Sequence, residues 1–250
     1  MSSTIDPDDF VKPFISETLG SKSLYFSISA IQSSMNLMQP DALALEYSRT
    51  MMGFLLFNPA PSRIAMIGLG GGSLAKFCYR HLPQSRMDVV EINPHVVALR
   101  DAFLIPKDDR RFKVILGDGA QFVQQPPHRY DVLLLDGFDL RGLPSSLSSR
   151  RFFEHCLDAL QPGGILVANL HYKHAHFETC VTRIRSVFKD GVQVVVEPDE
   201  DNATVFACKD AVLPAPAKGP KGQALRPARL PDVAWAQLDE AFAHIVRSWR

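Results

Sequence analysis

The hydrophobic pattern of residues 41–210 alternates between short apolar runs and segments of helical character. Apolar runs of strand length predict strands at residues 64–67, 87–91, 113–116, 132–135, 165–169, 192–196 and 204–208. The intervening segments predict helices at residues 73–80, 94–103, 120–124, 150–160 and 176–188. Because strands that are apolar along their whole length need cover on both faces, we predict an α/β fold with a doubly wound, mostly parallel seven-stranded sheet.

Both ends of the chain depart from this alternation. Residues 24–31 (LYFSISAI) alternate and are rich in β-formers, which predicts a strand in a short N-terminal β-hairpin region. Prolines and glycines exclude a regular element from residues 213–231. The following segment, 232–249, predicts an amphipathic helix that docks on the main domain or on a partner subunit. The predicted divisions are an N-terminal β region (1–40), a Rossmann-like catalytic domain (41–212), a linker (213–231) and a C-terminal helix (232–250).

A glycine-rich loop directly follows the first strand of the main domain. Gly68, Gly70 and Gly71 allow a tight turn and the close approach of a ligand. Glu91 closes the second strand about 20 residues later, where an acid accepts hydrogen bonds from ribose hydroxyls. Leu74 occupies the last glycine position of the dinucleotide pattern, which disfavours NAD. A non-binding turn with a surface acid is the alternative interpretation.

Acidic residues also follow the third and fourth strands. Asp118, before Gly119, suits contact with an adenine amino group in a space that the glycine leaves open, but it equally suits a helix N-cap. Asp136 and Asp139 lie three residues apart at the carboxyl end of the fourth strand. In a dry cleft such a pair holds a cationic amine or takes a proton from it. The alternative is a loop whose acids face water or the arginines at 150 and 151.

Several of these motifs lie together at a recurring spacing. SLYFSISAIQ ends in Gln32, ALEYSRTM contains Tyr47, and the glycine loop, Glu91, the pair 118–119 and the loop 136–142 follow in order, before RRFFEHCLDALQPGGILVANL. From about residue 23 to residue 170 the chain therefore resembles the spermidine synthases, the polyamine aminopropyltransferases. The resemblance implies a class I methyltransferase-like fold and at least a dimer. Apolar residues before Pro40 suit a homodimer interface: Met35, Leu37 and Met38.

The resemblance also implies roles for individual residues. The co-substrate would be decarboxylated S-adenosylmethionine or S-adenosylmethionine, and the acceptor a small amine. Asp136 would accept the proton of the amine, and Asp139 and Tyr47 would help to hold the acceptor. The donor would be bound by residues of the N-terminal strand, the glycine loop and the two following strand ends: Gln32, Gly68, Gly70, Gly71, Glu91, Asp118 and Gly119.

The chain departs from the family pattern on the amine side. Gly71 stands where the family has the aspartate that binds the aminopropyl amine, and Ser48 replaces the His or Gln after the motif tyrosine. Leu140 replaces a proline, and a later proline is shifted to Pro144. Leaving a buried ammonium without its carboxylate is costly, so these changes weaken the prediction of specific spermidine synthesis.

Three functions therefore stay open. The leading one is a spermidine-synthase-like transferase that moves an aminopropyl group to an amine. The second is a methyltransferase, because loss of the loop aspartate at Gly71 relaxes selection against the carboxylate-bearing donor. The third is a non-catalytic homologue that binds a nucleoside or a partner protein. An NAD-dependent oxidoreductase is a distant fourth, since it leaves Asp136 unexplained.

Composition narrows the partners. The chain has 27 basic and 27 acidic residues, which removes a global attraction to nucleic acid or to an anionic membrane. Since no apolar stretch reaches about 18 residues, we predict no membrane span. Four widely spaced cysteines without a CxxC pair suit reduced, buried thiols and a cytoplasmic location.

Histidines and a tyrosine follow the fifth strand. His171, His174 and His176 have no carboxylate or cysteine arranged with them, so we interpret them as residues that line or cover the pocket and predict no metal site. Tyr172 suits stacking on a substrate.

Overall fold

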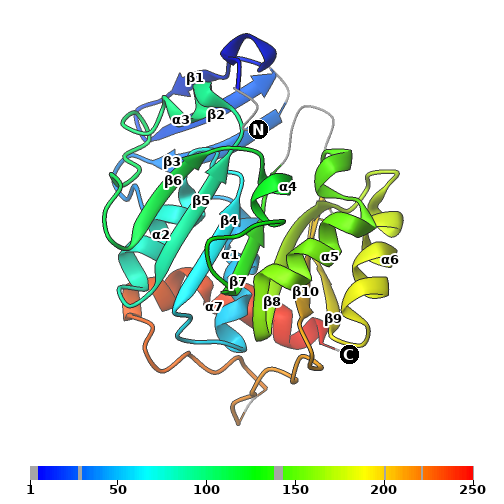
Figure 1. Ribbon diagram of the computed structural model, residues 1–250. Helices are drawn as coiled ribbons and strands as arrows, with labels where there is room; N and C mark the ends of the chain where they lie inside the picture. Colours follow the sequence, from blue (N-terminus) through cyan, green and yellow to red (C-terminus); the bar gives the residue numbers. More distant parts are fainter. Residues whose placement is uncertain (1–4, 28–29, 138–142, 200, 221, 250) are drawn as a thin grey trace.

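The computed structural model describes residues 5–27, 30–137, 143–199, 201–220 and 222–249, and of residues 30 and 31 it describes the backbone only. Its centre is a seven-stranded sheet with the strand order β6-β5-β4-β7-β8-β10-β9 (Figure 1). The strands are β4 (Arg63–Ile67), β5 (Arg86–Glu91), β6 (Phe112–Leu116), β7 (Tyr130–Leu135), β8 (Leu160–His171), β9 (Val192–Val196) and β10 (Asn202–Cys208). Only β10 runs antiparallel to its neighbours β8 and β9. The predicted doubly wound, mostly parallel sheet is confirmed.

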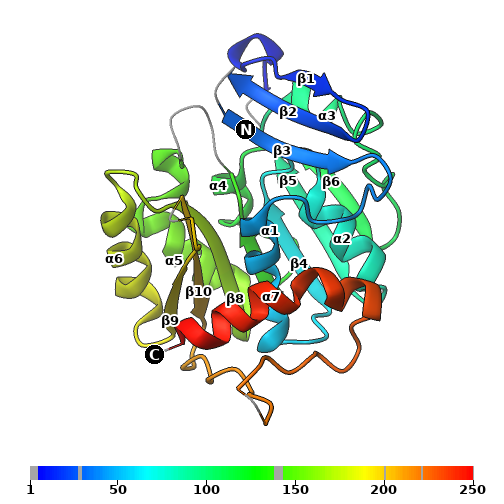
Figure 2. The ribbon, with the colours of Figure 1, turned by 180° about the vertical axis from the view of Figure 1, so that it is seen from behind.

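Helices cover both faces of this sheet. They are α1 (Glu46–Met51), α2 (Ser73–His81), α3 (Pro94–Val97), α4 (Gly119–Phe122), α5 (Arg150–Ala159), α6 (Phe177–Phe188) and α7 (Asp232–Ser248), with short 3-10 turns η1 (Pro7–Asp9), η2 (Met52–Leu56) and η3 (Ser145–Leu147). One buried cluster packs α1, α2 and α7 on one face, and a second packs α5 and α6 on the other. The red helix α7 crosses over α1 on the face seen in Figure 2.

The N-terminal region forms a separate antiparallel sheet of three strands, β1 (Phe14–Glu17), β2 (Ser21–Ser27) and β3 (Ala30–Asn36). The predicted short N-terminal β-hairpin region is confirmed, but residues 24–31 contribute to two antiparallel strands rather than one, since Ser27 pairs with Ala30. The β-forming alternation of the sequence runs through both strands, so the local pattern does not reveal where one ends and the next begins. The sheet packs on the main domain through buried Leu24 and Met35.

The helix predicted at 94–103 is also shorter than expected. It ends at Val97, and turns follow up to Leu104, whose φ of 53° is unusual for a leucine. This backbone buries Phe103 and Ile105 on both sides of the exposed Leu104. The ammonium of buried Lys76 donates to the Phe103 carbonyl at 2.9 Å. Tertiary contacts to the glycine loop and to α2 therefore outweigh local helix propensity here.

The C-terminal helix α7 is part of the core of the main domain. Leu238, Phe242 and Ile245 are fully buried, whereas Val233 is 61% exposed. A Cβ at Gly53 in η2 would lie 2.4 Å from the Ile245 side chain, so only glycine permits this approach. The predicted amphipathic helix is confirmed, and it docks on its own chain.

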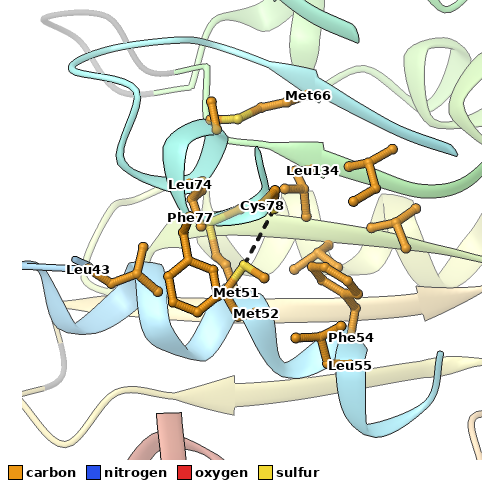
Figure 3. Close-up of a cluster of buried hydrophobic side chains, with 14 of the residues drawn as sticks. Leu43, Met51, Met52, Phe54, Leu55, Met66, Leu74, Phe77, Cys78 and Leu134 are labelled. Carbon is orange, nitrogen blue, oxygen red and sulfur yellow. Dashed lines mark hydrogen bonds between the residues drawn. The ribbon is translucent and has the colours of Figure 1, made fainter. Parts of the chain in front are cut away.

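Buried methionine and aromatic side chains fill the space between α1, α2 and the sheet. Figure 3 shows Met51 and Met52 of the α1–η2 segment against Phe77 and Cys78 of α2. All four cysteines of the chain are buried and free. Among the described residues, no helix has the length and apolar character needed to cross a membrane.

Replacing Phe242 should test the contribution of α7 to the core. Phe242→Ala leaves a cavity beneath a fully buried ring and should lower the free energy of unfolding by about 3–5 kcal/mol. Val233→Ala on the exposed face of the same helix is the matched control and should change it by less than about 0.5 kcal/mol. Urea titration measures both values, and equal losses would show that α7 is not packed as described.

Candidate active site

The glycine loop and Asp136 meet where the strand order reverses, at the carboxyl ends of β4 and β7. Gly68 has a φ of 92°, and a Cβ there would lie 2.2 Å from the Asp136 carbonyl oxygen. The Asp136 amide in turn donates to the Ile67 carbonyl at 2.9 Å. The close backbone contact requires glycine and brings the predicted donor loop against the predicted catalytic acid.

Two side chains hold the half-buried carboxylate of Asp136. Tyr47 on α1 donates its hydroxyl to Oδ2 at 3.2 Å, and Asn169 on β8 donates its amide to Oδ1 at 3.0 Å. Burial raises the pKa of the Asp136 carboxyl above its usual range, and the two hydrogen bonds oppose this shift. Burial and the neighbouring Asp136 raise the pKa of Tyr47 well above its ordinary value, so its phenol stays protonated and donates.

Glu91 is fixed by the backbone of the loops around it. Its carboxylate accepts from the Leu69 amide at 2.9 Å and from the Asn93 amide at 2.8 Å. Burial raises the pKa of Glu91, and the backbone hydrogen bonds oppose the shift. The backbones of Gly70 and Ile92 also contribute hydrogen bonds, so amides of the loops on both sides surround this carboxylate.

Asp118 caps helix α4, as the alternative interpretation predicted, because its Oδ1 accepts from the Ala120 amide at 2.8 Å. A Cβ at Gly119 would lie 2.4 Å from the Ile67 side chain. Close packing of α4 on β4 therefore accounts for this glycine, and the space beside it is filled by Ile67 rather than left open for a ring. Ile92 directly follows β5, and Leu116 is the last residue of β6. Both side chains are exposed and add apolar surface beside Glu91 and Asp118.

The space beside Gly71 is closed by the N-terminal sheet. A Cβ at Gly71 would lie 2.6 Å from Ser33 Oγ and 3.0 Å from the Phe103 ring. Ser33 Oγ lies 3.4 Å from Ser73 Oγ. Hydroxyl groups thus occupy the region in which the resemblance places a carboxylate.

The remaining predicted residues lie around this centre. Gln32 is half-buried at a bulge in β3, since Leu24 pairs with Ser33 and Tyr25 with Ile31. Bulges of this kind redirect side chains and are frequent next to active sites.

Three further positions complete the comparison with the sequence. Ser48, buried on α1, donates its hydroxyl to the Leu45 carbonyl of its own turn. Tyr172 packs edge-on against Phe177, 5.0 Å between ring centres, within the cluster on the face of the sheet opposite to Asp136. Asp139 lies outside the described residues.

A row of polar side chains crosses the carboxyl end of the sheet beneath α1, and sequence reasoning missed all but its first member. Asp136 follows β7, Asn169 lies on β8, Thr204 on β10 directly opposite Asn169, and Glu197 follows β9. Glu197 is 3% exposed and accepts from Thr50 Oγ1 of α1 at 3.0 Å. One signal was available for Asp136, Asn169 and Glu197, because the residue two positions before each of them, on the same face of its strand, is apolar and buried. In β10 the apolar residues of that face follow Thr204 instead.

His171, the last residue of β8, and His174 and His176 after it line a cavity of about 290 Å³ on the face of the sheet that carries α6. Arg183 and Ser148 border the same cavity, and the Arg183 guanidinium donates to the Ser148 carbonyl at 2.9 Å. Within the described ranges, no group of three or more histidine, cysteine or acidic side chains is placed to hold a metal ion. The cavity is separate from the Asp136 centre.

Comparison with known proteins decides between the families that share such a sheet. Residues 44–198, more than half of the chain, match the family model of the spermine/spermidine synthase domain. The chain belongs to the spermine/spermidine synthase family. The fold class and the resemblance predicted from the sequence are confirmed.

Individual members of this family give the extent of the similarity. The polyamine aminopropyltransferase of Neisseria meningitidis serogroup A is 40% identical over 195 residues, which cover 77% of this chain and 74% of the relative. That of Chromobacterium violaceum is 38% identical over 198 residues, 79% of this chain and 76% of the relative. The crystal structure of a probable spermidine synthase from Corynebacterium glutamicum superposes with a TM-score of 0.69 at 25% identity, covering 78% of this chain and 76% of that one.

The free energy of unfolding should depend on pH because of the buried carboxyl of Glu197. Burial raises its pKa from the ordinary 4.5 to about 7, and nearby Glu46 and Asp199 also raise it. Because the folded protein then holds the proton more tightly than the unfolded chain, this stabilisation is complete below about pH 4.5 and is lost as the pH rises to about 7. In the wild type, Glu197 should therefore lower the free energy of unfolding by up to about 3 kcal/mol between pH 4.5 and 8. Glu197→Gln should lack this part of the pH dependence.

The measurement is urea unfolding of both proteins across this pH range. Asp199→Asn removes an exposed carboxylate nearby and should leave most of the pH dependence in place. Identical pH profiles for the wild type and Glu197→Gln would show that Glu197 titrates as an ordinary surface acid.

Proposed function

We propose that this chain is a transferase that moves an aminopropyl group from decarboxylated S-adenosylmethionine to a small amine, with Asp136 as the proton acceptor. One observation carries the proposal: the carboxylate of Asp136 is held by Tyr47 and Asn169 while its backbone touches Gly68 of the glycine loop. This arrangement would place an amine at Asp136 within reach of a donor on the loop.

The residues around the glycine loop suit the adenosine half of such a donor. Glu91 would accept from the ribose hydroxyls, and the oxygen of Asp118 that does not cap α4 would accept from the adenine amino group. Ile92 and Leu116 offer exposed apolar side chains beside these acids, where a flat ring would cover them. Gln32, Gly68 and Gly70 would complete the donor site. Gly71 and Gly119 would take part only through their backbones, because Ser33 and Ile67 fill the space beside them.

Asp136 would prepare the amine for attack. Burial raises the pKa of Asp136, which makes it a stronger proton acceptor than an exposed aspartate. After the ammonium gives a proton to Asp136, its nitrogen has a free electron pair. That nitrogen bonds to the aminopropyl carbon next to the sulfonium, the carbon–sulfur bond breaks, and its electron pair stays on sulfur as a neutral thioether. Tyr47 would keep the carboxylate aligned throughout.

Further parts of the proposal concern the acceptor and the assembly. Tyr47 and Asp139 would contact the amine substrate, whereas Tyr172, predicted from the sequence for this role, packs on the opposite face of the sheet and would not. The relatives named above are polyamine aminopropyltransferases, which supports a polyamine-type acceptor. We also propose a homodimer in the cytoplasm.

Replacing Asp136 should separate catalysis from donor binding. Asp136→Asn removes the proton acceptor and should lower kcat by about 10²–10⁴-fold, because a positioned base contributes that much. Methylthioadenosine release from decarboxylated S-adenosylmethionine, with putrescine and related amines as acceptors, measures the rate.

The matched control is Asp158→Asn, which changes an exposed acid on α5 and should leave the rate unchanged. The proposal fails if no amine yields methylthioadenosine with the wild type, or if Asp136→Asn retains the wild-type rate.

Methyl transfer from S-adenosylmethionine is the second candidate, and the serine beside Gly71 is the observation that favours it. With Ser33 Oγ in place of a carboxylate, this part of the proposed donor site has no negative charge to select an aminopropyl ammonium or to repel a carboxylate.

Donor preference should therefore be weak in the wild type. Calorimetry should give affinities for the two donors within about tenfold of each other, because no like charge discriminates against the carboxylate. The double variant Gly71→Asp/Ser33→Gly makes room for the acid and should shift the preference toward the decarboxylated donor by at least about tenfold. Ser33→Gly alone is the control. A strong wild-type preference for the decarboxylated donor would count against the methyltransferase.

A further inference from the structure

Helix α1 holds two carboxylates at the end of the sheet. Tyr47 donates to Asp136 at 3.2 Å, and Thr50 donates to Glu197 at 3.0 Å. Residues three apart lie on the same side of a helix, so both contacts come from one face of α1. Only the first contact involves the proposed proton acceptor.

The sheet holds the same two carboxylates from below. Asn169 donates to Asp136 at 3.0 Å, and Thr204, paired directly with Asn169 across β8 and β10, lies 3.5 Å from Glu197. Each acid is thus held between one residue of α1 and one residue of the sheet. A single turn of α1 separates the two contacts.

The helix itself is too short to fix its own position. It spans six residues, and its N-cap, Leu45, has no side-chain hydrogen bond. Isolated helices of this length are unstable in water, so α1 depends on its tertiary contacts. Apolar packing of Met51 and Met52 fixes how deeply the segment is buried, but it is non-directional. A hydrogen bond is directional, so the bond from Thr50 to Glu197 restricts the rotation of the helix in a way that apolar packing does not.

We propose that Glu197 is a positioning residue for the reaction: by holding Thr50 it fixes the rotation of α1 that brings the Tyr47 hydroxyl to Asp136. The proposal rests on the proposed function, in which Asp136 accepts the proton. Glu197 is 3% exposed and bonds to Thr50, so it acts through α1 rather than on the reacting atoms. Misplacement of a catalytic group by about 1 Å is enough to slow a reaction by orders of magnitude.

A double-mutant cycle tests the contact. Thr50→Val and Glu197→Ala each break it and should each lower kcat by about tenfold, with the KM for the donor unchanged. The double variant should be no slower than the slower single variant, because both changes remove the same contact. Thr50→Ser and Glu197→Gln keep a donor and an acceptor in place and should retain kcat within about threefold.

A second readout does not depend on activity. The NMR signal of the Asp136 carboxyl carbon can be assigned because it is absent from the spectrum of Asp136→Asn. Its chemical shift, followed as a function of pH, gives the pKa of the carboxyl. Loss of the Tyr47 hydrogen bond should raise this pKa in Thr50→Val, in Glu197→Ala and in the reference variant Tyr47→Phe. Removing the Glu197 charge acts in the opposite direction, so Glu197→Gln should show no rise. Asp199→Asn, which removes a neighbouring exposed charge, is the control and should behave as the wild type.

Three results would overturn the proposal. Multiplicative losses of kcat in the double variant would show that the two residues act independently. Equal losses in Glu197→Gln and Glu197→Ala would show that the charge is what matters, as for an acid that binds a second ammonium of the substrate. A lower melting temperature without a change in kcat or in the Asp136 pKa would reduce Glu197 to a structural role. If the wild type transfers to no amine, the proposed function fails, and the NMR titration still decides whether Glu197 positions Tyr47.

Discussion

The carboxylate of Asp136 imposes the constraint on which the rest of the site depends. Among the described residues it has no basic partner, so burying it requires hydrogen bonds from neutral donors. Tyr47 and Asn169 supply them, the first from α1 and the second from β8. Helix α1 must therefore lie across the sheet, although it is only six residues long. Its cover by α7 explains why a helix near the C-terminus belongs to the core of the main domain.

The same point of the sheet joins the two halves of the proposed reaction. A parallel sheet directs the carboxyl ends of its strands to one edge, and the reversal of strand order between β4 and β7 places the loops that follow them side by side. Gly68 removes the side chain that would separate the two loops there. The glycine thus serves the contact between loops as much as the approach of a ligand. A pattern that suggests only nucleotide binding in the sequence would thus also join the proposed donor and acceptor sites.

The sequence predicted those elements whose pattern is local. Seven strands could be located because buried parallel strands are apolar throughout, and α7 because its apolar residues recur at helical spacing. The reversal between Ser27 and Ala30 and the early end of α3 could not be predicted, because pairing and the anchor at Phe103 are contacts between distant residues. For the same reason Asn169 and Glu197 were missed: each is one polar residue at the end of an apolar strand, and only the fold brings them beneath α1.

The distribution of acids around the site bears on which cation it selects. Beside Gly71, where the resemblance places a carboxylate, the chain has the hydroxyls of Ser33 and Ser73. Beneath α1 it has the half-buried carboxyl of Asp136 and the buried carboxyl of Glu197, and burial raises the pKa of both. A raised pKa means that each carboxyl is stabilised by a proton or by a cation that approaches it. Carboxyls are therefore available to a cation beneath α1, on the side of the proposed acceptor, whereas hydroxyl groups lie directly beside Gly71. Such a site would select a cationic group mainly at Asp136, where the acceptor amine would bind. It would select the donor mainly through the adenosine part of that molecule.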